Sequence, residues 1–390
     1  MSQLPENRPR LLVLTPAADL YGSDRALLMA LPALVERFEV VLVSAADGPM
    51  LEASRALGVE TMVTPDWALR RRGLHPRALP ATAFRVVQSL KILRRLHKRQ
   101  PFDLIYANTV ANALLPLLRF AVSRPIVVHV REVPRDRGRM ALVLFGVVDR
   151  VAARVLCNSK FTADLVVKLV PNLASRVHAV PDGIVALDAV ETGIGDHSVL
   201  QVVCVGRIHP KKGQATLIEA ARLAKNEGHR WHLHFWGDAL PEHQELERSL
   251  LQAVEAGGLA DDVTWHGYSA DTRSMYEHMD VAVVPSTLPE EFSLVTAEAQ
   301  VVGLPVVATG PGGPSDILIE GETGNIVPPE NPAALCSALV ALQDPIRRAR
   351  WGAAGRLRTL ERFTIDRYAP AVAEQLVEAL AVAATTPDRR

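Results

Sequence analysis

The fold is decided by a stretch near the middle of the chain, VLQVVCVGRIHPKKGQATLIEAARLAKN (199–226). The apolar run 199–205 is short and rich in valine, which is typical of a buried strand. A basic turn with glycines follows it, and residues 214–226 carry apolar side chains at helical spacing. A buried strand, a tight turn and a helix form the repeating unit of a parallel sheet covered by helices. The stretch therefore predicts an α/β fold.

The same alternation repeats on both sides of this stretch. Towards the N-terminus we expect strands at 10–15, 39–44, 60–63, 103–107, 125–130, 155–157 and 176–180, with helices at 23–36, 50–57, 79–99, 110–121, 140–152 and 160–170. Towards the C-terminus we expect strands at 231–236, 263–265, 281–284 and 305–308, with helices at 241–256, 271–279, 293–302, 332–342, 345–360 and 365–383. Because residues 183–198 lack such periodicity, we predict a linker there and two doubly wound domains, 1–187 and 188–364.

The composition is that of a globular protein. The chain has 390 residues, of which 48% are hydrophobic and 22% charged, and this excludes disordered and fibrous proteins. The three cysteines lie far apart, which argues against a zinc site or a disulfide framework. Residues 1–10 lack the apolar core of a signal peptide, and the longest apolar run, 140–148, is too short to span a membrane. We therefore expect a cytoplasmic protein.

The two halves of the chain have opposite charge. Residues 1–187 contain 26 Lys and Arg against 15 Asp and Glu, whereas residues 188–390 contain 17 against 28. Ten of the basic residues lie in 66–99 beside a single acidic residue, and six of the ten fall on the predicted helix 79–99, which also carries leucines. Such a helix can lie on an anionic membrane surface, and the alternative is an ordinary solvated face. No nucleic acid partner is expected, because no binding motif or aromatic platform accompanies the charge.

In the second half, the turn after strand 199–205 carries Gly206, Arg207 and Lys212. Glycine permits a close backbone approach, and two cations stand beside a helix N-terminus that already favours anions. The turn suits a diphosphate ligand. A solvated basic turn with a glycine cap is an equal alternative from this motif alone.

Two glutamates, Glu290 and Glu298, follow strand 281–284 at a spacing of about two helical turns. Carboxylates accept bidentate hydrogen bonds from neighbouring hydroxyl groups. An acidic helix start would explain Glu290 equally well, but it does not explain Glu298 within an apolar stretch. The loop 309–316 is rich in glycine, so that its N–H groups can form a nest for an anion or simply a turn.

With these three loops in this order, the chain resembles the retaining GT-B glycosyltransferases of glycosyltransferase family 4, strongly over 199–327 and in layout elsewhere. The resemblance implies two Rossmann-like domains facing across a cleft, with the donor on the second and the acceptor on the first. It also implies that the final helix, about 365–390, crosses back onto the first domain. The expected reaction moves a sugar, with retention and without a metal or other cofactor, from a UDP- or GDP-sugar to a hydroxyl of a glycan or lipid-linked acceptor in cell-envelope or glycoconjugate synthesis.

The resemblance assigns donor-binding roles to residues that follow strands of the second half. Ser293 stands where the family usually has glycine, and Asp316 where a glutamate is usual, which leaves the donor open. Asp238 fits a simple turn residue equally well. The assignments are Arg207 and Lys212 to the diphosphate, Glu290 to the donor sugar, Glu298 to the ribose, the backbone N–H groups of Leu294 and Val295 beside Ser293 to the phosphates, and Gly237, Asp238 and Tyr268 to the base.

In the first half, the resemblance places Gly22 near the donor phosphates and the acceptor. The segment from His129 to Glu132 ends strand 125–130, where many family members have a His-Asp pair. Aligning strand ends puts Arg131 at the histidine place and Glu132 at the aspartate place, so Arg131 would stabilise phosphate charge and Glu132 would orient it or accept the acceptor proton. His129 would stand close to the reacting sugar or be a buried strand histidine. Asp182 fits a structural turn before the linker.

The departure at Arg131 keeps other functions open. A GT-B sugar-nucleotide epimerase would convert the donor without an acceptor, and a phosphorylase would carry a lysine-bound pyridoxal cofactor. A non-catalytic nucleotide-sugar-binding or scaffold protein of the same fold is the alternative from another class.

Overall fold

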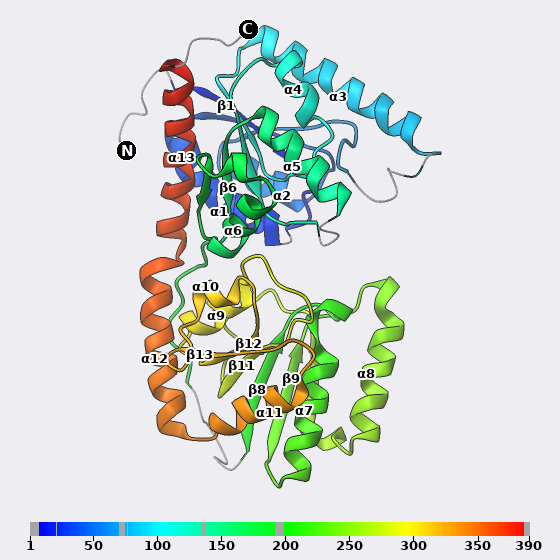
Figure 1. The fold of residues 1–390 in the computed structure, drawn as a ribbon, viewed down its shortest axis with the longest axis vertical. Coiled ribbons are helices and arrows are strands. Elements are labelled where there is room, and N and C mark those ends of the chain that lie inside the picture. The colour runs from blue at the N-terminus through cyan, green and yellow to red at the C-terminus, as the bar shows by residue number, and fades with distance from the viewer. Residues whose placement is uncertain are drawn as a thin grey trace. The chain divides into compact units, whose positions relative to one another are not determined.

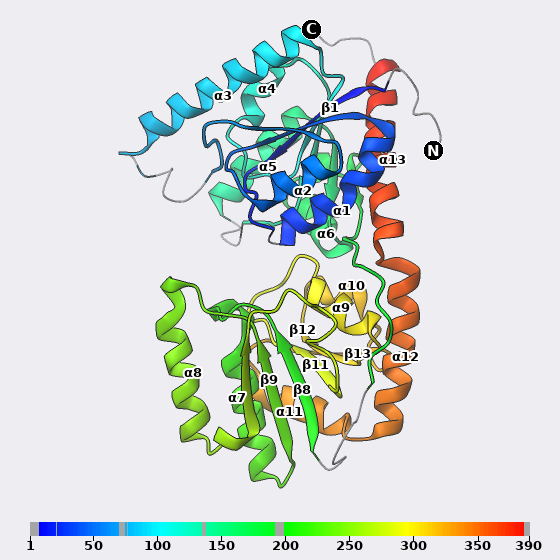
Figure 2. The same cartoon turned by 180° about the vertical axis from the view of Figure 1, so that it is seen from behind.

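The computed structural model describes residues 8–20, 22–69, 75, 77–134, 138–191 and 199–385 (Figures 1 and 2). The chain divides into two compact units. The first unit holds the residues up to Gly183 together with those from Ile365 onwards, and the second holds Ile184–Thr364. The division falls four residues before the predicted boundary at 187. Each unit contains one parallel sheet with helices on both faces.

The sheet of the first unit has seven parallel strands in the order β3-β2-β1-β4-β5-β6-β7. The strand order reverses between β1 and β4, which is where ligands bind in doubly wound sheets. The strands are β1 (Arg10–Thr15), β2 (Glu39–Ser44), β3 (Glu60–Val63), β4 (Leu104–Ala107), β5 (Ile126–Val130), β6 (Ala152–Cys157) and β7 (Val177–Ala179).

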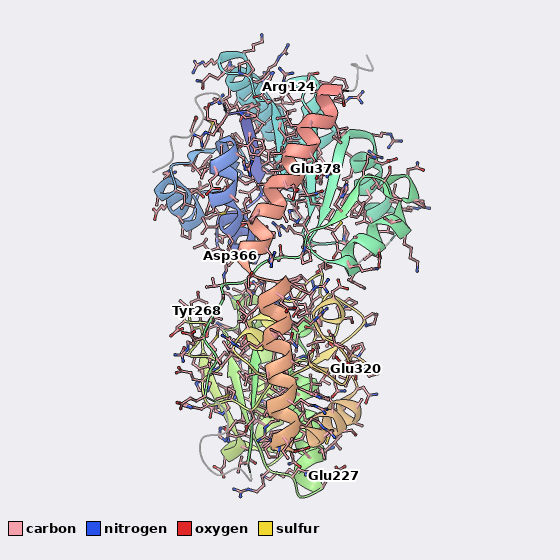
Figure 3. All side chains as sticks on the ribbon, turned by 90° about the vertical axis from the view of Figure 1, so that its left-hand side faces the viewer. Arg124, Glu227, Tyr268, Glu320, Asp366 and Glu378 are labelled. Carbon is pink, nitrogen blue, oxygen red and sulfur yellow. The ribbon has the colours of Figure 1, made fainter. Side chains whose placement is uncertain are left out.

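Two apolar clusters cover the two faces of this sheet. One face packs against α1 (Gly22–Arg37), α2 (Pro49–Ala56) and α13 (Ile365–Thr385). The other packs against α3 (Leu79–Arg99), α4 (Leu115–Ala121), α5 (Arg139–Val151) and α6 (Lys160–Leu169). The helix α13, on which Figure 3 labels Asp366 and Glu378, lies along α1. It buries Tyr368, Val372 and Leu376 in the first unit.

The second unit is built around six parallel strands in the order β10-β9-β8-β11-β12-β13. The strands are β8 (Leu200–Val205), β9 (Trp231–Trp236), β10 (Val263–Gly267), β11 (Val281–Val284), β12 (Val306–Thr309) and β13 (Gly324–Val327). The helices are α7 (Gln214–Asn226), α8 (Gln244–Ala256) and α11 (Pro332–Ala341) on one face, and α9 (Leu294–Val301) and α10 (Pro314–Ile317) on the other, with α12 (Pro345–Arg362) packed on α9.

The structure corrects three predicted elements. The segment 271–279 is a run of turns and not a helix, because the Asp271 carboxylate accepts hydrogen bonds from the N–H groups of Arg273 and Ser274 and competes with helical bonding. The predicted helix 110–121 begins only at Leu115. The glycine-rich loop 309–316 leads into the short helix α10, and β13 follows where no strand was predicted.

Candidate active site

Glycines bring together the loops that follow the strands of the second unit. At Gly213, where φ is 68°, an added Cβ atom would lie 1.8 Å from the carbonyl oxygen of Pro285, so the loops after β8 and β11 touch. At Gly237, where φ is 124°, it would lie 2.4 Å from the carbonyl oxygen of Gly206. The N–H of Gly237 also donates to the carbonyl of Gly267 at 2.7 Å. Four loops therefore meet at one edge of the sheet through backbone contacts that no side chain would permit.

Lys212 and Glu290 form an ion pair at this edge, with 2.5 Å between Nζ and Oε1. The hydroxyl of Ser286 donates to the same oxygen at 2.7 Å. Burial raises the pKa of Glu290, but the Lys212 charge and hydrogen bonds from Lys212, Ser286 and Ser293 outweigh burial and lower it to about 2. Glu290 is thus a carboxylate at neutral pH, able to accept hydrogen bonds from hydroxyl groups but holding no proton to donate.

The helix α9 begins at Leu294, four residues after Glu290, and a strained residue, Ser293, precedes it. Ser293 has φ 95° and ψ 82°, a left-handed conformation that favours glycine. A positive φ is the physical reason to expect glycine at this place, and Ser293 adopts the same left-handed turn with a side chain present. Leu294 and Val295 form the half-buried first turn of α9, and Glu298 is buried on the same helix.

The other predicted donor residues lie around the same edge. Arg207 is exposed in the loop after β8, and Asp238 is exposed in the loop after β9. Tyr268 is exposed in the loop after β10 (Figure 3). The carbonyl of Asp238 accepts a hydrogen bond from the N–H of Ile208 at 3.0 Å, which joins two of the loops. The turn interpretation of Asp238 is consistent with this bond, and the roles of these residues towards a donor remain predictions.

The glycine-rich loop after β12 supports the Glu290 segment. The N–H of Gly313 donates to the carbonyl of Glu290 at 2.6 Å, and an added Cβ atom on Gly313 would lie 2.1 Å from the carbonyl oxygen of Phe292. The hydroxyl of Thr309 donates to the carbonyl of Ser286 at 2.5 Å. Because the Gly313 N–H is already bonded, the expected anion nest does not use it. This loop instead fixes the backbone that carries Glu290.

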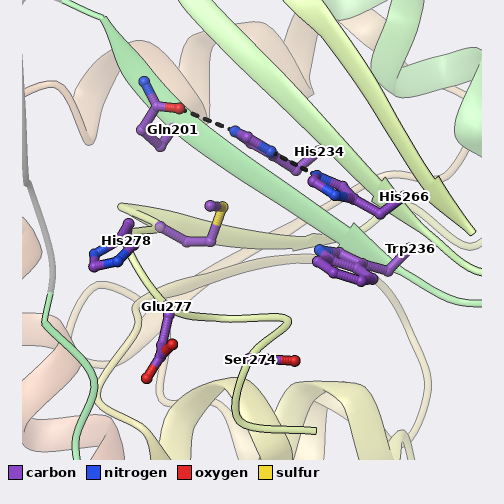
Figure 4. Close-up of a pocket in the computed structure, with 8 residues that line it drawn as sticks. Gln201, His234, Trp236, His266, Ser274, Glu277 and His278 are labelled. Carbon is purple, nitrogen blue, oxygen red and sulfur yellow. Dashed lines mark hydrogen bonds between the residues drawn. The ribbon is translucent and has the colours of Figure 1, made fainter. Parts of the chain in front are cut away.

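A pocket that sequence reasoning missed lies on the sheet face beside the turns of 271–279 (Figure 4). Its volume is about 420 Å³. His234 bridges two of its other lining residues, at 2.9 Å from Nδ1 to Nε2 of His266 and at 3.0 Å from Nε2 to Oε1 of Gln201. Burial and the neighbouring histidines lower the pKa of His234 to about 4, so its ring is neutral at pH 7. The alternating WHLHFW of β9 is the sequence signal that marked this face.

In the first unit, His129 is fully buried within β5. Its Nδ1 atom lies 2.6 Å from the hydroxyl of Tyr106. Burial, followed by the charge of Arg131, lowers the pKa of His129 well below its usual value. A contact with the reacting sugar needs an accessible ring, so the catalytic assignment of His129 is wrong and the buried strand histidine is what the structure contains.

Arg131 is also buried, at the centre of a polar network. Its Nε donates to Asn108 at 3.0 Å, one terminal nitrogen pairs with Asp182, and the other donates to the hydroxyl of Tyr368 at 2.7 Å. Burial opposes its charge, but Asp182 and the two tyrosines raise the pKa of Arg131 above its usual value. We expected the Arg131 guanidinium to face a donor phosphate. In the structure it instead joins the end of β5 to Tyr368 on α13 and to Asp182.

The remaining predicted residues of the first unit lie at the carboxyl edge of the sheet. Glu132 is exposed in the loop after β5, and Gly22 is the exposed first residue of α1. Their roles towards donor and acceptor remain predictions. Within the described ranges, no group of three or more His, Cys, Asp or Glu residues is arranged to hold a metal ion. No helix in that part of the chain is both long and apolar enough to cross a membrane.

Two family models match the chain, one on each side of residue 190. The model described as Glycosyltransferase Family 4 matches residues 22–186, and the model described as Glycosyl transferases group 1 matches residues 200–344.

Similar curated proteins are glycosyltransferases. The lipopolysaccharide core biosynthesis mannosyltransferase LpsB of Rhizobium meliloti is 31% identical over 44% of this chain, a match that spans half of that protein. The alpha-1,3/1,6-mannosyltransferase ALG2 of Mus musculus is 24% identical over 93% of this chain and 94% of its own length. A D-inositol 3-phosphate glycosyltransferase of Gordonia bronchialis is 28% identical over 88% of this chain and 80% of its own length.

Solved structures share the whole fold. Anabaena Alr3699/HepE, in complex with UDP and glucose, superposes with a TM-score of 0.78 at 22% identity over 95% of this chain and all of that one. The sucrose-phosphate synthase of Thermosynechococcus elongatus gives 0.77 at 21% identity over 96% of this chain and all of that one. The predicted fold class, two Rossmann-like units of the GT-B type, is confirmed. With both halves matched by glycosyltransferase models and the fold shared throughout, the chain belongs to glycosyltransferase family 4.

Proposed function

We propose that this enzyme transfers a hexose, with retention of anomeric configuration, from a UDP- or GDP-sugar to a hydroxyl group of a glycan or lipid-linked acceptor. The relatives support a hexose, since two are named mannosyltransferases, and a cell-envelope acceptor, since one acts in lipopolysaccharide core biosynthesis. A structure of the same fold holds UDP and glucose, which supports a uridine nucleotide as the first donor to test. The cytoplasm, where sugar nucleotides are made, is the proposed location.

The observation that carries this proposal is the Lys212–Glu290 pair at the carboxyl edge of the second sheet. About a third of the Lys212 side chain is exposed, which supports its access to a ligand phosphate. Arg207 and the N-terminus of α9 add positive charge on the same edge. A diphosphate with a sugar attached matches this pair, with phosphate at Lys212 and sugar hydroxyls at Glu290.

The chemical step would break the bond between the anomeric carbon and the diphosphate oxygen. A bond from the acceptor oxygen to the same carbon forms on the same face, and the acceptor proton passes to the departing phosphate oxygen. With a pKa of about 2, Glu290 is too weak a base to take this proton at neutral pH. Its work is to orient the sugar, while Lys212 and Arg207 stabilise the charge that develops on the leaving group.

The same cations make a metal unnecessary in this proposal, because they supply the charge compensation that a divalent ion gives other transferases. We expect transfer to continue at an unchanged rate in excess EDTA. Loss of transfer in EDTA, with recovery on adding Mg²⁺ or Mn²⁺, would contradict metal independence while leaving the donor site intact.

Other residues complete the proposed site. Glu298, buried on α9, would accept hydrogen bonds from the ribose, and the loops with Asp238 and Tyr268 would hold the base. Glu132 is the exposed carboxylate of the first unit that we propose faces the acceptor.

The first test is a thermal-shift screen of the full chain against UDP, GDP, ADP and their hexose conjugates, followed by transfer assays with the nucleotide that binds. We expect Lys212→Ala and Glu290→Gln each to lower the transfer rate about 100-fold with unchanged circular dichroism. Lys211→Ala is the matched control, since it removes a neighbouring lysine from the same turn and should keep the rate. NMR of the product should show the donor's anomeric configuration.

Wild-type turnover in both variants would overturn the assignment of the site. Conversion of the donor sugar in the absence of any acceptor would instead indicate an epimerase. Nucleotide binding without any turnover of the sugar would indicate a non-catalytic binding protein.

A further inference from the structure

Three consecutive helices of the first unit expose an unusual number of apolar side chains. The helix α3 packs on α4, α4 packs on α5, and all three cover the same face of the sheet (Figures 1 and 2). Their outward sides therefore lie on the same side of the first unit. Eight of the nineteen large apolar side chains exposed in the described ranges lie on it, and we call them the α3–α5 patch: Leu79, Phe84, Val87, Leu117, Phe120, Met140, Leu142 and Val143.

The exposure of this patch is not explained by packing within the unit. Phe84 and Phe120 are 63% and 68% exposed, while α3 turns Val86 and Leu93 into the core from its opposite side. Exposed apolar side chains gathered on neighbouring helices are typical of a site of interaction. The patch thus calls for a partner that buries aromatic and aliphatic side chains.

Basic side chains continue the same surface. The face of α3 that begins with Phe84 and Val87 runs on through Lys91, Arg94 and Lys98 at helical spacing, and α3 contains no acidic residue. In the described part of the chain these three cations have no ion-pair partner.

The cations also border the apolar side chains of α4 and α5. Arg119 stacks over the Phe120 ring at 4.7 Å, and Arg139 and Arg150 are exposed near the two ends of α5. Residues 70–74 and 76, which belong to the predicted basic stretch, lie outside the described residues.

We propose that the α3–α5 patch docks the first unit onto an anionic lipid bilayer, with the apolar side chains in the interface and the Lys and Arg side chains on lipid headgroups. Exposed apolar side chains beside the acid-free basic face of α3 fit an interface with an apolar layer under anionic headgroups. A second copy of this chain is a poorer partner, because a two-fold contact through this patch would bring like charges together. The inference deepens the proposed function, since it places the enzyme where a lipid-linked acceptor lies.

The experiment measures cosedimentation of the full chain with vesicles of equimolar phosphatidylglycerol and phosphatidylcholine, and with vesicles of phosphatidylcholine alone. We expect the wild type to bind the anionic vesicles, and to lose this binding in high salt. The double variants Arg94→Glu/Arg95→Glu and Phe84→Ser/Phe120→Ser should each lower the partition coefficient at least roughly tenfold.

Matched controls come from helices outside the patch. Ile346→Ser/Leu357→Ser removes two equally exposed apolar side chains from α12, and Arg350→Glu/Arg367→Glu reverses two exposed charges on α12 and α13. Both controls should bind vesicles as the wild type does. Every variant is compared by its melting curve and by nucleotide-sugar binding, so that loss of docking is distinguished from loss of the donor site.

A Phe120→Trp variant tests insertion directly. Its added fluorescence should be quenched by brominated lipids in anionic vesicles, and no such quenching would overturn insertion. Equal sedimentation of the wild type and either patch variant would overturn the proposal. The proposal would also be overturned if the wild type did not bind vesicles and instead formed a dimer in analytical ultracentrifugation. If the patch variants abolished that dimer, the patch would be an interface with a second copy of this chain.

Discussion

Both units place a basic side chain against a carboxylate beyond the strands of their sheets, but the two pairs differ in exposure. The Lys212 and Glu290 side chains are 34% and 15% exposed, whereas those of Arg131 and Asp182 are 5% and 7% exposed. Each of the three guanidinium nitrogens of Arg131 already has a protein partner. The more exposed pair, Lys212 and Glu290, is therefore able to exchange partners with a ligand. The buried pair, Arg131 and Asp182, stabilises the fold.

The chemistry of the two cations fits this division. A guanidinium is a planar fork that satisfies several fixed acceptors at once, and Asn108, Asp182 and Tyr368 supply them. The lysine ammonium is a flexible point charge on a mobile stem, which suits a group that must move towards a phosphate. Substituting residues of each pair therefore tests whether Arg131 and Asp182 act in stability while Lys212 and Glu290 act in donor binding.

The largest effect is expected at Arg131. The substitution Arg131→Ala leaves Asp182 buried and unpaired, which should lower the free energy of unfolding by about 3–5 kcal/mol. Equilibrium urea denaturation measures this change. Arg131→Lys keeps the positive charge but loses the planar guanidinium, so its free energy of unfolding should lie between those of the wild type and Arg131→Ala. A loss below about 1 kcal/mol in Arg131→Ala would show that the network adds little to stability.

The next largest effect on stability is expected at low pH, where protonation of Glu290 breaks the Lys212–Glu290 ion pair. The pKa of Glu290 is about 2 in the folded chain, below the 4.5 of a free glutamate, so its ionised form is stabilised by folding. This stability is fully present above pH 4.5 and is lost as the pH falls through 2, by about 3 kcal/mol. Unfolding measured over this range should be flatter for Glu290→Gln than for wild type. Identical pH profiles would place the pKa of Glu290 near its ordinary value.

A smaller effect on stability is expected at Lys212. Because this side chain is partly solvated, Lys212→Ala should lower the free energy of unfolding by only about 1 kcal/mol. Donor turnover should fall far more than this change in stability would suggest. If Lys212→Ala lost as much free energy of unfolding as Arg131→Ala, the conclusion that only the Arg131–Asp182 pair is mainly structural would be contradicted.

The smallest change is a gain at Ser293. Glycine adopts φ 95° without strain, so Ser293→Gly should raise the free energy of unfolding by about 0.5–1 kcal/mol. This gain is expected even though the substitution removes the hydroxyl that contacts Thr296 at 2.9 Å and hydrogen-bonds Glu290. Thermal denaturation measures this gain. A lower melting temperature would mean that the hydroxyl contact outweighs the strain.

The elements predicted correctly from the sequence are those whose formation depends on local apolar spacing. The bounds of β1, α7 and β9 follow directly from their apolar spacing. Lys212 and Glu290 were singled out because ligands bind at the carboxyl ends of parallel strands, and the structure shows that the two form an ion pair there. Arg131 was misinterpreted for a physical reason. Its position after β5 is visible in the sequence, but its burial depends on Tyr368, which lies 237 positions later in the chain.

Other failures have local causes that spacing alone conceals. The apolar residues of 271–279 match a helix, but the Asp271 side chain bonds to its own turn. The strand β13 has half-exposed positions and a glycine, so its pattern resembles a loop, although an added Cβ on Gly324 would lie 2.1 Å from the carbonyl oxygen of Val306 on β12.

The return of α13 to the first unit has a consequence for synthesis of the chain. The second unit is continuous from Ile184 to Thr364, so it is complete before the residues of α13 leave the ribosome. Until then the α1 side of the first core lacks Tyr368, Val372 and Leu376, and the Arg131 guanidinium lacks one of its acceptors. Although it is translated first, the first unit finishes folding last, and a nascent chain stalled after Thr364 would hold one finished domain and one with an open core.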